Sequence, residues 1–166
     1  MRGFSCWCRH LVHDGWLVRR YFPDTLMDHV ERAVSEGEAG HSAEIRVAIE
    51  ASLPLRELWR GCTARERALQ VFAELGVWDT EANNGVLLYV LLAERAVEIV
   101  ADRAASAAID TATWSGICES VARTCRTGRF EEGLLAGVAE MNRVLTVAFP
   151  ARGGDRDELP NRPAIL

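Results

Sequence analysis

The feature that most constrains the fold is an uninterrupted apolar run at residues 86–92. Asn-Asn-Gly precedes this run and Ala-Glu-Arg-Ala follows it, so turn-forming residues bound it on both sides. A run of seven apolar residues is too short to span a bilayer, but it suits a strand that is buried on both faces. Glu94 and Arg95 stand where a tight hairpin would turn, and residues 96–101 are predicted to form the returning strand.

An earlier strand is predicted within residues 41–53, where apolar and charged side chains alternate. At least one face of this strand is therefore partly exposed to solvent or lined by charged partners. We expect the strand to lie nearer the edge of the sheet. Thr63 and Glu66 form a capping box that begins a helix ending at Gly76. Strand, helix and strand at this spacing form a βαβ unit, whose two strands are parallel. In the strand predicted within residues 41–53, the alternating apolar and charged residues are Glu44, Ile45, Arg46, Val47, Ile49 and Glu50.

Amphipathic helices account for most of the remaining chain. Apolar residues at helical spacing follow Asp24, and two further helices are predicted between Asp110 and Pro150. The summed order α-β-α-β-β-α-α predicts an α/β fold, a three-layer α/β/α sandwich around a small mixed sheet. We expect residues 23–150 to form this domain, residues 1–22 to form a basic aromatic N-terminal arm, and residues 151–166 to form a surface tail.

The composition argues against several classes of function. All 19 basic residues are arginine, which excludes catalysis through a lysine Schiff base and the Walker phosphate-binding loop. The net charge of −5 argues against a nucleic-acid partner. All four histidines lie in the first quarter of the chain, so nucleophilic catalysis is poorly supported. Five cysteines without a secretory leader indicate reduced thiols and a cytoplasmic protein, and the pattern assigns no role to Cys6 and Cys8.

The N-terminal arm, residues 1–22, interleaves arginines with aromatic residues and contains a single acid, Asp14. This pattern suits an amphipathic segment on an anionic membrane surface, which would place the protein peripherally at the inner membrane. The alternative is an arm that packs its tryptophans on the domain. The candidate membrane-surface residues are Arg2, Trp7, Arg9, Trp16, Arg19 and Arg20.

Oxygen-bearing side chains collect at the amino end of the central strand. Asp79, Asn83 and Asn84 precede this strand, and the antiparallel hairpin returns Asp102 to the same edge of the sheet. Because carboxylate and amide oxygens suit Ca²⁺ or Mg²⁺, these four residues are candidate metal ligands. The alternative is turn chemistry, in which the aspartates cap turns and Asn-Asn-Gly supplies left-handed backbone conformations.

The central stretch, NNGVLLYVLLAERAVEIVADR, resembles the signature of the TPM domain family. HSAEIRVAIE resembles the family's first strand, GRFEEGLLAGVAEMNRVL resembles its last helix, and ELPNRPAIL resembles the ending of short bacterial members. The resemblance covers roughly residues 23–166 and implies an α/β/α sandwich. The family includes a thylakoid-lumen protein reported as an acid phosphatase, and some members are reported to bind Ca²⁺. The positions that match residue by residue are Asn83, Asn84, Gly85 and Asp102.

The chain departs from many relatives after the third predicted strand. Where those relatives carry a Gly-Tyr-Gly-Leu-Glu type of turn, this chain has Ala-Asp-Arg-Ala-Ala and lacks the glutamate. Two hypotheses follow. The first is a binding or accessory module that acts on an anionic membrane surface or a membrane-protein partner. The second is a weak acid phosphatase that depends on Ca²⁺ or Mg²⁺, with Asp79, Asn83 and Asp102 holding the metal.

Overall fold

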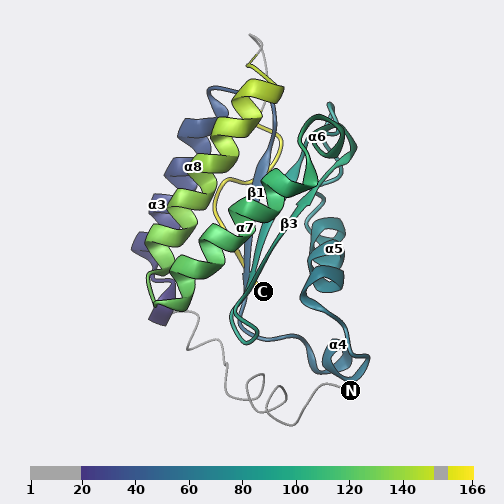
Figure 1. The fold of residues 1–166 in the computed structure, drawn as a ribbon, viewed down its shortest axis with the longest axis vertical. Coiled ribbons are helices and arrows are strands. Elements are labelled where there is room, and N and C mark those ends of the chain that lie inside the picture. The colour runs from purple at the N-terminus through teal and green to yellow at the C-terminus, as the bar shows by residue number, and fades with distance from the viewer. Residues whose placement is uncertain (1–19, 152–156) are drawn as a thin grey trace.

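The computed structural model describes residues 20–151 and 157–166. It confirms the predicted order of the main helices and strands and adds two short helices and one short strand (Figure 1). The elements in chain order are α3 (Asp24–Glu38), β1 (Ile45–Glu50), α4 (Leu55–Trp59), α5 (Ala64–Glu74), β2 (Val86–Leu91), β3 (Ala96–Ala101), α6 (Arg103–Ala108), α7 (Thr111–Arg126), α8 (Phe130–Ala148) and β4 (Ala164–Ile165).

The sheet is mixed and has the strand order β3-β2-β1-β4. β1 and β2 are parallel, with Ile45 opposite Val86 and Glu50 opposite Leu91, as the βαβ pattern predicts. β2 and β3 form the predicted antiparallel hairpin. Arg95 lies in its turn with a φ of 54°, in the left-handed region that such a turn requires.

Helices cover both faces of the sheet, which confirms the three-layer sandwich. α3, α7 and α8 lie on one face and α5 lies on the other (Figure 1). The side chains of β2 alternate between these two layers: Val86, Leu88 and Val90 join the core under the three helices, and the intervening residues join the core under α5. Both faces of β2 are therefore buried, which explains its lack of polar residues.

The prediction that the earlier strand lies nearer the sheet edge was wrong. β1 lies inside the sheet, between β2 and β4, and every one of its residues is buried. Its charged side chains meet protein partners instead of solvent. Arg46 donates to the carbonyl oxygens of Pro160 and Arg162, and Glu50 accepts hydrogen bonds from Arg67. Backbone carbonyls and an opposite charge thus satisfy the polar groups that otherwise mark an exposed strand face.

The prediction of a surface tail was wrong for residues 157–166. Ala164 and Ile165 pair with Ala48 and Ile49, so this segment supplies β4. Leu159 is buried and joins the core on the α5 side. The segment resembled a tail because it is rich in proline and charge, but its carbonyl groups receive the buried Arg46 guanidinium.

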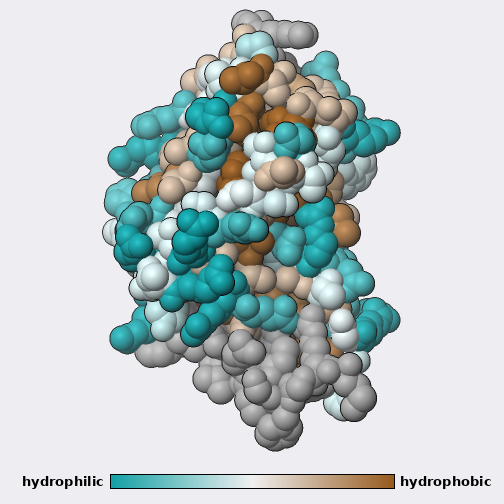
Figure 2. Space-filling model, in the orientation of Figure 1, coloured by the Kyte–Doolittle hydropathy of each residue, from teal (hydrophilic) through white to brown (hydrophobic). Residues whose placement is uncertain are grey.

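Hydrophilic side chains cover much of the molecular face shown in Figure 2, and apolar side chains appear between them. Across residues 20–151 and 157–166, no helix has both the length and the apolar composition needed to cross a bilayer.

Candidate functional site

The turn before β2 places Asn84 in the interior, where it is fully buried. Its Nδ2 donates to the carbonyl oxygen of Ser42 at 2.6 Å, and its Oδ1 accepts from Thr80 Oγ1 at 3.4 Å. Nδ2 therefore fastens this turn to the segment before β1, and Oδ1 fastens it to Thr80. Asn84 has a structural role in this geometry, because both polar atoms of its buried carboxamide are engaged.

Asn83 joins the same turn to α6. Its φ of 53° is left-handed, as predicted for the Asn-Asn-Gly turn. Its Oδ1 accepts a hydrogen bond from Arg103 Nη2 at 2.7 Å, and its carbonyl oxygen accepts from the backbone N–H of Ala104 at 2.9 Å. Arg103 was not among the predicted site residues; it follows Asp102 directly and places a cation at this edge of the sheet.

Asp102 is the N-cap of α6 and is only 9% exposed. Its Oδ1 accepts from the backbone N–H of Arg103 at 2.7 Å, and its own N–H donates to the carbonyl oxygen of Gly85 at 2.9 Å. Its Oδ2 is buried without a hydrogen-bond partner among the described residues. The structure thus brings Asn83, Asn84 and Asp102 to one edge of the sheet, as predicted. Asp79 is exposed, and no described contact joins its side chain to the other three.

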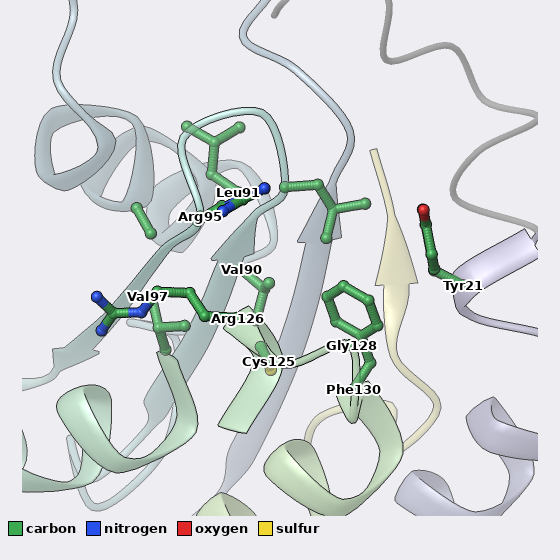
Figure 3. A pocket seen from close by; sticks show the side chains of 11 residues that line it. Tyr21, Val90, Leu91, Arg95, Val97, Cys125, Arg126, Gly128 and Phe130 are labelled. Carbon is green, nitrogen blue, oxygen red and sulfur yellow. The ribbon is translucent and has the colours of Figure 1, made fainter. Parts of the chain in front are cut away.

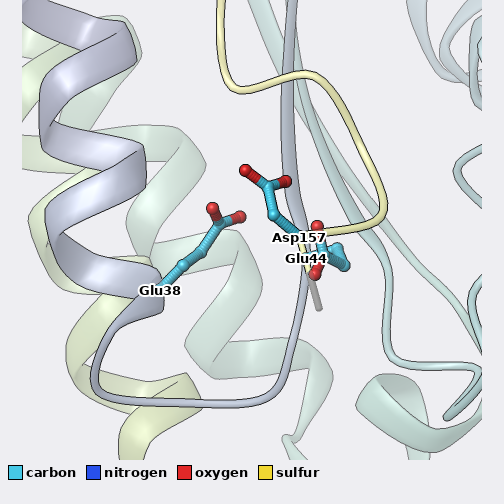
Figure 4. Close-up of side chains that lie close together, drawn as sticks. All are labelled: Glu38, Glu44 and Asp157. Atoms are coloured by element: carbon cyan, nitrogen blue, oxygen red, sulfur yellow. The ribbon is translucent and has the colours of Figure 1, made fainter. Parts of the chain in front are cut away.

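A second oxygen-rich cluster was not predicted. Glu38 ends α3, Glu44 precedes β1, and Asp157 lies in the C-terminal segment. Carboxylate oxygens of these three residues all lie within 4.8 Å of one another (Figure 4). We call these residues the carboxylate cluster. No local pattern in the sequence indicates this cluster, because the three side chains come from separate segments and meet only when the C-terminal segment packs beside β1.

Backbone N–H groups hold two members of the carboxylate cluster in place. Glu38 Oε1 accepts from the N–H of Ile45 at 2.9 Å, and Glu44 Oε2 accepts from the N–H of Leu159 at 3.1 Å. Asp157 Oδ2 accepts from Asn161 Nδ2 at 3.0 Å. The Oδ1 atom of Asn161 is buried and has no partner within the described part of the chain.

Burial of the carboxylate cluster changes its protonation. Burial raises the pKa of Glu38 to about 8; the hydrogen bond from Ile45 opposes this rise, and the carboxylates of Glu44 and Asp157 add to it. Burial likewise raises the pKa of Glu44. Near neutral pH the cluster is therefore stabilised by a proton or by a cation. Its donor set consists of hard oxygen atoms, which fits Ca²⁺ or Mg²⁺, and the exposed Asp157 leaves it open to solvent.

In a chelating buffer, we expect the stability of the protein to fall as the pH rises from about 4.5 to about 8. Glu38 has an ordinary pKa of 4.5 but a pKa of about 8 in the folded protein. The unfolded chain therefore loses this proton first, and the stabilisation is complete below the lower value and lost above the higher one. Thermal unfolding with EDTA across this window measures the effect. Glu38→Gln should flatten the profile, and an unchanged slope in that variant would contradict the assignment to Glu38.

Five of the six predicted membrane-surface residues lie outside the described residues: Arg2, Trp7, Arg9, Trp16 and Arg19. Cys6 and Cys8 also lie outside them. Arg20, the sixth, is exposed where the chain enters the domain. The membrane interpretation of the N-terminal arm stays a prediction.

Comparison with known proteins identifies the family. The family model for the TPM domain matches residues 21–144. Among solved structures, the BA42 protein from the psychrophilic bacterium Bizionia argentinensis is similar, with a TM-score of 0.75 and 26% sequence identity; the match covers 86% of this chain and 93% of that chain. No curated protein matches the chain. Because the family model spans well over half of its length, this chain belongs to the TPM domain family.

Proposed function

We propose that this TPM domain protein is a binding or accessory module that takes up a divalent cation, Ca²⁺ or Mg²⁺, at the carboxylate cluster. The observation that carries the proposal is the convergence of Glu38, Glu44 and Asp157 within 4.8 Å. A second observation supports it. The buried Oδ1 of Asn161 has no hydrogen-bond partner among the described residues, and the same carboxamide donates to Asp157. An oxygen atom of this kind is a suitable additional ligand for a hard cation.

The consequence of cation binding would be structural. The cluster joins the end of α3, the segment before β1 and the C-terminal segment that supplies β4. A cation at this point would offset the mutual repulsion of the three carboxylates and fasten the C-terminal segment to the sheet. A ligand that binds only the folded state stabilises the protein. The bound cation would therefore determine how firmly β4 and Leu159 are held. A C-terminal segment fastened by a bound cation would present one fixed surface, which suits a partner-binding module.

Calcium and magnesium titrations by calorimetry test the proposal. We expect saturable binding to the wild type and about tenfold or more weaker binding to Asp157→Asn, which removes one charged ligand and retains the amide contact. Glu36→Gln is the matched control, because Glu36 is exposed on α3 outside the cluster, and it should bind as the wild type does. Binding that survives in Asp157→Asn but disappears in Asp102→Asn would contradict the cluster and move the site to the Asn83–Asp102 edge.

The second candidate function is a weak divalent-dependent acid phosphatase, and one observation favours it. The buried Oδ2 of Asp102, which has no partner in the part of the chain that the structure describes, offers a ligand to a metal. The neighbouring Arg103 offers a guanidinium that suits a phosphoryl group. Arg103 would have to release Asn83 to bind phosphate. Hydrolysis of p-nitrophenyl phosphate at acid pH should then require the metal and be lost in Asp102→Asn. Metal-dependent hydrolysis that is equal in this variant would exclude the role of Asp102.

A peripheral membrane association through the N-terminal arm is part of the proposed accessory role. The arginines and tryptophans of residues 1–22 support it. Co-sedimentation of the full chain with anionic vesicles at low salt is the test. Replacing Arg2, Arg9 and Arg19 with glutamine should abolish capture, and capture that persists in this variant would exclude the association.

A further inference from the structure

A cavity of about 200 Å³ opens at the carboxyl end of β2, beside the β2–β3 hairpin. Its walls are largely apolar. Val90 and Val97 come from the hairpin strands, and Tyr21 and Phe130 line it from the far side with ring centroids 5.1 Å apart (Figure 3). Cys125 also lines the cavity, and burial raises the pKa of its thiol to about 11, so this side chain is uncharged near neutral pH.

The position of the cavity is where this fold class binds ligands. In open α/β sheets, ligands lie outside the carboxyl ends of the parallel strands. β1 and β2 are the long parallel pair, and the cavity includes Val90, Leu91 and Leu92 at the end of β2. The turn with Asn83 and the N-cap Asp102 lie at the opposite end of this strand. The cavity is therefore separate from the oxygen-rich edge and from any metal bound there.

Two arginines border the apolar walls. Arg95 comes from the hairpin turn and Arg126 from the last turn of α7. Arg126 Nε donates to the carbonyl oxygen of Ala122 at 3.0 Å, and no ion pair engages either guanidinium in the part of the chain that the structure describes. The neighbouring Arg129, by contrast, is paired with Glu132 at 3.0 Å. Within residues 20–151 and 157–166, the cavity therefore combines an apolar interior with two cations that pair with no carboxylate.

The backbone of Arg95 has an unusual conformation. Its φ of 54° lies in the left-handed region, which glycine or asparagine adopts more readily than arginine. The exposed Arg95 is thus held at the mouth of the cavity by a turn that would be less strained with glycine. This position also offers a substitution, Arg95→Gly, that removes the guanidinium and relieves the backbone.

We infer that the cavity binds a single-chain anionic amphiphile, a medium-chain carboxylate, with its carboxylate on Arg95 and Arg126 and its tail against Val90, Val97 and Phe130. Arginine presents paired N–H donors that match a carboxylate. The cavity is smaller than the roughly 300–1,000 Å³ of pockets for drug-sized ligands, which favours one short apolar tail. The inference does not depend on cation binding at the carboxylate cluster.

The test is a titration of the isotope-labelled full chain with sodium octanoate, followed by NMR and compared with the neutral probe octanol. We expect saturable shifts at Val90, Val97 and Phe130. The double variant Arg95→Gly/Arg126→Gln should bind octanoate at least about tenfold more weakly, as expected for the loss of charge-assisted hydrogen bonds. Arg123→Gln is the matched control, since Arg123 is exposed on α7 outside the cavity, and it should bind as the wild type does.

Four results would overturn the inference. The first is the absence of saturable shifts with octanoate, and the second is equal affinity in the double variant. The third is octanol binding as tightly as octanoate, which would make the arginines irrelevant. The fourth is binding to anionic phospholipid vesicles alone, which would make the ligand a membrane surface and not a single amphiphile.

Discussion

Replacing Arg67 with methionine should lower the free energy of unfolding by about 3–5 kcal/mol. Arg67 lies on α5 and is only 7% exposed. Its Nε donates to Glu50 Oε2 at 3.0 Å, its Nη2 donates to Glu50 Oε1 at 3.1 Å, and its Nη1 donates to Glu74 Oε1 at 2.9 Å. Glu50 is itself 3% exposed and accepts a further hydrogen bond from the hydroxyl of Tyr89. Without Arg67, the Glu50 carboxylate is left buried and without its cation.

Denaturant unfolding of Arg67→Met measures this loss, and Arg143→Met is the matched control. Arg143 also makes an arginine–glutamate pair, with Glu140, but on the exposed surface of α8. Its removal should cost far less than the removal of Arg67, because exposed ion pairs contribute little. The double variant Glu50→Gln/Arg67→Met should recover part of the stability. Equal costs for the two arginine variants would contradict the account of a buried pair that joins α5 to β1.

Replacing Gly85 with alanine should cost about 3 kcal/mol or more. A Cβ atom at this position would lie 2.1 Å from the carbonyl oxygen of Val77, and this backbone atom cannot move aside as a flexible side chain can. Gly85 also accepts the backbone hydrogen bond of Asp102. We therefore expect the substitution to disturb the turn before β2 and the start of the hairpin together.

The control for Gly85→Ala is Gly116→Ala. Gly116 is exposed in the middle of α7, and an added Cβ there would meet nothing within 4 Å. This substitution should raise stability by about 0.5–1 kcal/mol, because alanine is the better helix former. The unfolding midpoints of the two variants should thus move in opposite directions. A Gly85→Ala protein within about 0.5 kcal/mol of the wild type would contradict the close approach of the two backbones.

The parts of the fold that depend on local sequence were predicted from it. The apolar run of β2, the hairpin turn at Arg95 and the parallel pairing with β1 all appear in the structure. The capping box at Thr63 also forms as predicted. The apolar run, the hairpin turn and the capping box each lie in a short window of residues, where periodicity and capping chemistry are direct signals. The parallel pairing follows from the strand-helix-strand connection.

The predictions that were wrong share one physical cause. The sequence does not show which partner a charged side chain meets in the folded protein. Arg46 indicated a strand face exposed to solvent, yet its guanidinium donates to the carbonyl groups of Pro160 and Arg162. Glu44 and Asp157 meet although they lie far apart in the sequence. The sequence pattern predicts that Asn83 and Asp102 lie together at the amino end of β2, because the hairpin geometry is local. It could not place the C-terminal segment, whose pairing with β1 is a long-range contact.

The most direct test of the proposed cation site is a crystal structure of the full chain grown with Mn²⁺, which replaces Ca²⁺ or Mg²⁺ at oxygen sites and scatters anomalously. We expect an anomalous peak between the carboxylates of Glu38, Glu44 and Asp157, with the carboxamide oxygen of Asn161 turned toward it. A peak beside Asp102 instead, or no peak at either place, would contradict the carboxylate cluster as the site.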